Sequence, residues 1–379
     1  MPPRPDAELA PLDVVSNMDK GPLQEVKVPA EWADKFVPGS LELTELRWQH
    51  EDNRVWSTAS YRARLSVDTE VTVVFDVTQT QSPEAKREAH ITKRLAMLDY
   101  MRLVPARHIC PVYETQVFEG STFCLRPDVD TKLGAVLPDG PGEEMVSLAT
   151  SLQLLVDILR GLRTLEQAGI VHFDLSPESI VIKNGRAYIS NLGRACIEHD
   201  GDERCRCKLL HDKGTLMIGS ALRHPPEMTD GQPTGAANAV WAAGLILAEL
   251  LMGEMPVVTY LVRDLIDAET FPNTADGRRK ARKCVTLLDK DAQSRAVVRD
   301  VVEDDFDIRL LDAFDDLEPP LQVLLTGMLA KDVGERWSTA EALQMVESAM
   351  RRLGVEILEE TPFLLLTDSW YTPDSWYTP

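Results

Sequence analysis

The sequence lacks long apolar runs and has little positive charge. No stretch of about eighteen or more apolar residues occurs, which is the length that a membrane-spanning helix needs. The longest candidate, Val240 to Met252, suits a buried helix. The formal net charge is −21. Because this charge repels phosphate backbones and anionic lipid, we expect no nucleic-acid partner and no membrane insertion.

Cysteine is scarce as well, with 6 in 379 residues, too few for a disulfide-scaffolded small domain. Some thiol and imidazole groups nevertheless cluster, and these weak metal candidates are Cys196, His199, Cys205, Cys207 and His211. Their spacing matches no standard zinc module, so free thiols, one disulfide and a metal site all stay open, and we expect no metal. A disulfide would imply an oxidising compartment.

The two ends of the chain show no sustained periodicity. Residues 1–39 are rich in proline and acidic residues and predict an N-terminal arm or linker. They lack the charged start and apolar core of a secretion signal, which predicts a cytoplasmic protein or a processed chain. Residues 356–379 predict a tail in which the hexapeptide Asp-Ser-Trp-Tyr-Thr-Pro occurs twice in tandem. A disordered end and a docking peptide both remain open for this tail.

Residues 40–127 have the pattern of a small antiparallel sheet with one main helix. Short stretches alternate between apolar and polar side chains, as strands with one buried face do. The expected strands are residues 61–66, 71–77, 112–117 and 122–125. A proline at a helix start predicts the helix, from Pro83 to about Leu98.

Residues 128–355 predict a larger, mainly helical unit. Leucines recur at three- and four-residue intervals from Leu148 to Leu162, and Gly169 stands just past the end of this pattern, so an amphipathic helix is expected here. Ser338 and Glu341 predict a capping box at the start of a last helix.

Between the apolar runs of residues 169–193 lies a polar loop, followed by the hairpin signal Asn184-Gly185. The stretch contains His-Phe-Asp-Leu-Ser-Pro-Glu-Ser at 172–179 and Asn-Leu-Gly at 191–193. It resembles the catalytic loop and the metal-binding turn of protein kinases, which have the patterns H-R-D-L-K-P-E-N and D-F-G.

Three further elements carry the same resemblance. Arg-His-Pro-Pro-Glu at 223–227 resembles the A-P-E motif, Arg336 resembles the arginine that pairs with its glutamate, and Val-Trp-Ala-Ala-Gly at 240–244 is similar to D-V-W-S-x-G. Their order implies an α+β, bilobal protein-kinase-like fold. In this fold residues 40–127 form a β-rich N-lobe and residues 128–355 a larger, mainly helical C-lobe.

Several of the residues that kinases use for phosphoryl transfer are missing from this sequence. The resemblance implies a glycine-rich loop over the phosphates, a strand lysine that contacts them, and two metal ligands. Residues 49–64, where the glycine loop belongs, contain no glycine. Depending on register, Val74 or Asp76 takes the place of the lysine, and Glu88, at the position of the helix glutamate, has lost that partner.

The catalytic loop is altered too. Ser176 replaces a lysine, Ser179 replaces the metal-binding asparagine, and Asn191 replaces the D-F-G aspartate. Magnesium prefers anionic oxygens, so an amide at the last position weakens a metal site. Only Asp174 remains at the position of the catalytic base.

From these substitutions we predict a protein that is not an enzyme. We expect a pseudokinase that binds no cofactor, ATP or magnesium and acts as a protein-binding scaffold or allosteric regulator. The missing glycine loop resembles the glycine-loop-lacking branch of the rhoptry and dense-granule kinases of apicomplexan parasites. That resemblance implies a parasite protein secreted into the parasitophorous vacuole or the cyst wall.

The alternative to a pseudokinase is an atypical active kinase or related transferase. In it Asp174 is the base, and the metal and phosphate ligands are relocated.

Overall fold

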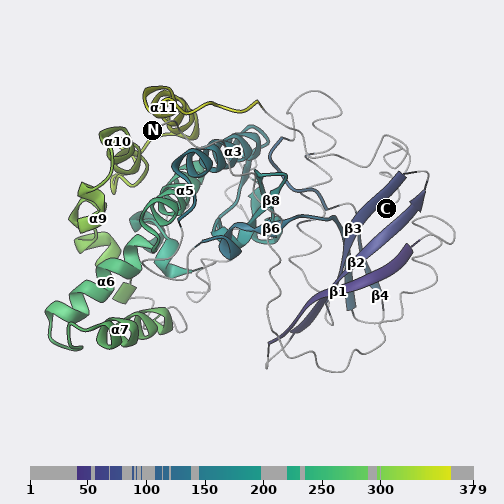
Figure 1. Ribbon diagram of the computed structural model, residues 1–379, viewed down its shortest axis with the longest axis horizontal. Coiled ribbons are helices and arrows are strands. Elements are labelled where there is room, and N and C mark those ends of the chain that lie inside the picture. The colour runs from purple at the N-terminus through teal and green to yellow at the C-terminus, as the bar shows by residue number, and fades with distance from the viewer. Residues whose placement is uncertain are drawn as a thin grey trace, which may run out of the picture.

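The computed structural model divides into a β-rich part and a mainly helical part (Figure 1). This arrangement confirms the predicted α+β, bilobal fold. The residues that the structure describes are 41–52, 56–67, 69–78, 88, 91, 95, 107–112, 114–118, 121–137, 145–197, 220–230, 235–288, 297, 298 and 300–359.

The β-rich part is a five-stranded antiparallel sheet with the order β1-β2-β3-β5-β4. Its strands are β1 (Leu41–Asp52), β2 (Trp56–Val67), β3 (Thr69–Thr78), β4 (Glu114–Phe118) and β5 (Ser121–Pro127). The four predicted strands all overlap these. In the predicted helix, Glu88, Ile91 and Leu95 are helical and buried, at the spacing of one helix face.

Two small sheets carry the loop at the centre of the sequence. A three-stranded sheet has the order β6-β8-β9, and a strand pair joins β7 to β10. Their strands are β6 (Thr131–Lys132), β7 (Ile170–Val171), β8 (Ile180–Lys183), β9 (Arg186–Ile189) and β10 (Cys196–Ile197). The predicted hairpin turn is confirmed between β8 and β9, where Asn184 and Gly185 have φ values of 51° and 71°, the left-handed region that such two-residue turns require.

The helical part is built on α3 (Leu148–Gln167), the helix that the leucine pattern predicts. The hydroxyl of Ser147 caps its start by accepting a hydrogen bond from the Thr150 backbone N–H at 3.2 Å. Helix α3 packs against α5, α11 and β9 and leads directly into β7. The other helices are α5 (Gly235–Met252), α6 (Pro256–Asp267), α7 (Ala275–Leu287), α9 (Asp312–Asp315), α10 (Pro319–Met328) and α11 (Thr339–Arg352).

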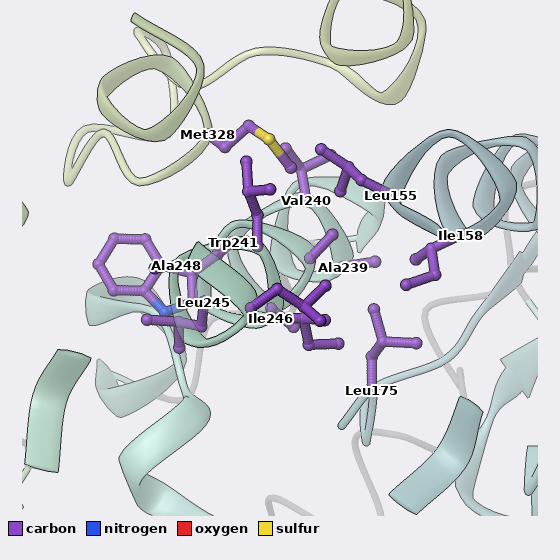
Figure 2. Packing of buried hydrophobic residues seen from close by; sticks show 14 of the residues in the cluster. Leu155, Ile158, Leu175, Ala239, Val240, Trp241, Leu245, Ile246, Ala248 and Met328 are labelled. Carbon is purple, nitrogen blue, oxygen red and sulfur yellow. The ribbon is translucent and has the colours of Figure 1, made fainter. Parts of the chain in front are cut away.

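Helix α5 is long and apolar enough to cross a membrane by length and composition alone, but most of it is buried inside the protein. This confirms the prediction of a central buried helix. Figure 2 shows Leu155 and Ile158 of α3, Leu175 and Met328 gathered around α5. Since Leu175 follows Asp174 directly, the core packing of α5 reaches the central loop.

The chain beyond α11 returns to α3. The backbone N–H of Leu358 donates to Gln153 Oε1 at 2.9 Å, and its carbonyl accepts from Arg160 Nη1 at 3.2 Å. The carbonyl of Glu359 accepts from Arg186 Nη1 at 2.5 Å. Side chains of α3 and β9 therefore hold consecutive backbone groups of this segment.

Gly327 of α10 gives a test of the packing between α10 and the segment before α11. A Cβ atom at this position would lie 2.2 Å from Cε2 of the Trp337 ring. Because a ring in a packed site cannot move freely, Gly327→Ala is expected to cost about 1–3 kcal/mol of stability, measured by chemical denaturation. Gly334→Ala is the matched control, because its nearest neighbour is Asp332 Oδ1 at 3.3 Å. Equal stabilities of the two variants would contradict the prediction.

Candidate functional site

His172 is fixed inside the protein at the start of the central loop. It is 1% exposed, its Nε2 lies 3.1 Å from the Ser190 carbonyl oxygen, and its Nδ1 accepts from the Asp174 backbone N–H at 3.2 Å. Burial lowers the pKa of His172 from its ordinary value. A neutral imidazole that uses both nitrogens in this way holds the loop and is not available as a base.

Asp174 is partly buried, and its carboxylate pairs with an arginine. Its side chain is 17% exposed, and Oδ2 accepts from Arg194 Nη1 at 3.2 Å. Phe173, just before it, has a φ of 59°, which is uncommon for a bulky side chain and shows that the surrounding loop is tightly held. The aspartate at the base position is therefore in a defined place with a cation beside it.

Ser179 serves the loop itself. The residue is 0% exposed, and its hydroxyl donates to the Ser176 carbonyl at 2.8 Å and accepts from the Ser176 N–H at 2.9 Å. These bonds close the 3₁₀ turn Pro177–Ser179. The hydroxyl at the predicted metal-ligand position is thus directed toward Ser176.

Asn191 lies on the surface at the end of β9 with a φ of 59°. Asparagine tolerates this left-handed conformation better than most residues. The N–H of the next residue, Leu192, donates to Glu88 Oε1 at 3.3 Å. The Asn191 turn is thereby joined to the helix of the β-rich part.

Glu88 lacks the expected strand lysine but has a cationic partner on another strand. The carboxylate is buried, at 4% exposed, and it accepts from Arg126 Nη1 at 3.4 Å and from Nη2 at 3.3 Å. Arg126 lies on β5, directly opposite Val74 of β3. The cation therefore comes from the strand next to the one that carries the lysine in the family.

Sequence reasoning missed Arg126 because its role depends on the register between β3 and β5. The one signal in the sequence is an arginine at the end of the otherwise apolar stretch Phe123 to Leu125. A buried carboxylate needs such a partner.

Glu178 belongs to the outer side of the loop. Its side chain is 69% exposed and forms an ion pair with Lys132 at 3.6 Å. Exposed pairs of this kind contribute little to stability. Glu178 therefore remains accessible at the edge of the site.

The remaining predicted site residues lie partly or wholly outside the described part of the chain. Val74 and Asp76 are described as backbone of β3 and Cys196 as backbone of β10, and His199, Cys205, Cys207 and His211 lie outside the described residues. Among the side chains that the structure does describe, no group of three or more His, Cys, Asp and Glu could hold a metal ion.

The predicted ion pair between Glu227 and Arg336 is confirmed. Arg336 Nη1 lies 2.5 Å from Glu227 Oε1, and Nη2 lies 2.8 Å from Oε2. The Arg336 guanidinium also lies over the ring of Trp241, with Cζ at 5.0 Å from the ring centroid. This pair anchors the 3₁₀ turn Pro226–Asp230 to the helical core.

Comparison with known proteins agrees with this geometry. Residues 74–346 match the family described as "Protein kinase domain". The chain is 26% identical over 151 residues to a probable serine/threonine-protein kinase of Bifidobacterium longum, which covers 39% of this chain and 18% of that protein. It is 28% identical over 215 residues to human serine/threonine-protein kinase 40, covering 53% of this chain and 45% of that protein. The chain thus spans less than half the length of these relatives.

The prediction that the protein is not an enzyme is wrong, because the matching domain and its serine/threonine kinase relatives point to a protein kinase. That prediction rested on the combined loss of the glycine loop, the strand lysine and both metal ligands, whereas Arg126 gives Glu88 a cation from another strand. The comparisons do not test the separate expectation that ATP is not bound. The match over residues 74–346 covers well over half of the sequence, and the chain belongs to the protein kinase family.

Proposed function

We propose that the chain is a serine/threonine protein kinase of atypical design, with Asp174 as the base. The observation that carries the proposal is the placement of Asp174. Its backbone is tied to the buried His172, and its carboxylate is partly exposed beside Arg194. A carboxylate held in this way can accept the proton of an approaching hydroxyl group.

In the proposed step, a serine or threonine oxygen forms a bond to the γ-phosphorus of ATP. The bond between this phosphorus and the β,γ-bridging oxygen breaks, ADP leaves, and the hydroxyl proton passes to Asp174. The residues at the two metal-ligand positions do not fit magnesium: the Ser179 hydroxyl is bonded to Ser176, and Asn191 offers a neutral amide. The proposed step therefore uses no magnesium, and protein cations balance the phosphate charge.

Asp174→Asn tests this proposal. An amide cannot accept the proton, so the rate of phosphate transfer is expected to fall at least about 10²-fold. The assay follows radiolabelled phosphate from ATP to casein, with magnesium and with a chelator. Glu166→Gln is the control, because it removes an exposed carboxylate at the end of α3. Equal rates for Asp174→Asn and the wild type, or no transfer above background by the wild type, would contradict the proposal.

A second candidate function is regulation of a protein partner by binding. The observation that favours it is that Asp174 and Ser179 are already engaged, the first with Arg194 and the second with Ser176. The resemblance to rhoptry and dense-granule kinases, with the secreted location that it implies, belongs to this candidate. Asp174→Asn separates the two functions, because a kinase loses transfer in this variant, whereas a protein that acts only by binding shows no transfer even as the wild type and keeps its partner.

A further inference from the structure

The ion pair of Glu88 and Arg126 stands at a junction of three elements. Glu88 comes from the helix of the β-rich part, Arg126 from β5, and Leu192, whose N–H donates to the same carboxylate, from the turn after β9. The Glu88 side chain is 5% exposed, whereas that of Arg126 is 27% exposed. The pair is therefore open to solvent on the side of the arginine.

The position of Arg126 on the sheet matters as much as its partner. Its cross-strand neighbour is Val74, one of the two positions that stand in place of the family's phosphate-binding lysine. Directly opposite residues in an antiparallel sheet have Cα atoms only about 4.5–5.5 Å apart. An arginine side chain is longer than this distance, so a cation from β5 can serve the space beside β3.

We propose that Arg126 binds the phosphates of a nucleoside triphosphate in place of the missing strand lysine, an inference that rests on the proposed kinase function. Both terminal nitrogens of the Arg126 guanidinium donate to Glu88, and since each nitrogen carries two N–H groups, each keeps one donor for another acceptor. Arginine binds phosphate through paired hydrogen bonds and keeps its charge at any physiological pH. Glu88 fixes the orientation of the guanidinium, as the helix glutamate does for the lysine in other kinases.

The proposal also explains why the lost lysine leaves no unpaired carboxylate. A buried glutamate without a cation would be strongly destabilising, and Arg126 neutralises Glu88 from the neighbouring strand. Arg126 thus neutralises the buried Glu88 carboxylate and also supplies a positive charge for the phosphates of a nucleotide.

The experiment compares ATP with adenosine, which lacks phosphates, in thermal-shift titrations of the full chain. We expect Arg126→Met to weaken ATP binding at least about tenfold and to leave adenosine binding unchanged. Arg126→Lys should keep part of the preference for ATP. Lys183→Met, which removes a cation on the β8–β9 hairpin, is the control and should behave like the wild type.

Two further variants keep the result decisive. Arg126→Met leaves the buried Glu88 carboxylate unpaired and can fail to fold. The double variant Glu88→Gln, Arg126→Met removes the carboxylate charge, and we expect it to fold and to bind ATP more weakly than the wild type does. Asp174→Asn removes a negative charge and should bind ATP no more weakly than the wild type, so its loss of transfer reports on the base and not on Arg126. ATP binding by Arg126→Met that equals or exceeds that of the wild type would overturn the inference, and so would a wild type that ATP does not stabilise.

Discussion

Asp157→Asn is expected to lower the free energy of unfolding by about 3–5 kcal/mol, because it leaves the Arg186 guanidinium charged and buried without a carboxylate. The Asp157 side chain is 0% exposed and that of Arg186 is 7% exposed. Neither charge can turn to water in the folded protein. The loss is therefore much larger than that of a surface ion pair.

The geometry explains why an amide is a poor substitute for Asp157. Oδ1 accepts from Arg186 Nη2 at 2.6 Å and from Gln153 Nε2 at 3.0 Å. Oδ2 accepts from Arg186 Nε at 2.8 Å and from the Ala187 N–H at 3.1 Å. Both oxygens act only as acceptors, so an asparagine would direct an NH₂ group at two donors.

Urea denaturation of the full chain measures the effect. Asp276→Asn is the control, because the Asp276 carboxylate pairs with Arg279 and Lys280 on the exposed surface of α7 and should scarcely matter. A loss below about 1 kcal/mol for Asp157→Asn would mean that the buried pair tolerates the amide. Hydrogen exchange at the Leu358 amide gives a second readout, because this N–H donates to Gln153, which also donates to Asp157.

This network could not be predicted from the sequence. Asp157 lies within a leucine-rich helix, and its partner Arg186 comes from β9, 29 residues later. Nothing in the helical periodicity selects that arginine among the 40 basic residues. Only the packing of α3 against β9 brings the two together.

Local patterns, by contrast, predicted local structure well. The hairpin at Asn184-Gly185 and the capping box of Ser338 and Glu341 depend on neighbouring residues, and both are present. Their geometry is fixed within a few positions of the chain. The same reasoning gave the extent of α3, but not what its polar residues contact.

The candidate site lies between these two cases. Family motifs located Asp174, Ser179 and Asn191, but they could not show that the Ser179 hydroxyl is bonded to Ser176. Nor could they show that Arg126 supplies the cation for Glu88. The absence of a motif residue, here the strand lysine, therefore did not establish the absence of its interaction, because a residue on another strand can supply the positive charge.

Glu227→Gln is expected to cost about 3–5 kcal/mol as well, for a pair that the motifs did predict. The Arg336 side chain is 0% exposed, and its Nε donates to the Ala330 carbonyl at 2.9 Å. The carbonyls of Ala237 and Lys331 accept from its two terminal nitrogens at 3.3 Å each. These neutral acceptors keep the guanidinium in place but do not neutralise its charge.

A double-mutant cycle separates the charge from the other contacts of Arg336. Arg336→Met removes the charge and the carbonyl bonds but keeps an apolar side chain against the Trp241 ring. The double variant Glu227→Gln, Arg336→Met leaves no buried charge, so it should be more stable than the sum of the two single losses predicts. Additive losses in urea denaturation would show that the carbonyl bonds and the Trp241 contact, and not the pairing of charges, hold the turn before α5 against the segment before α11.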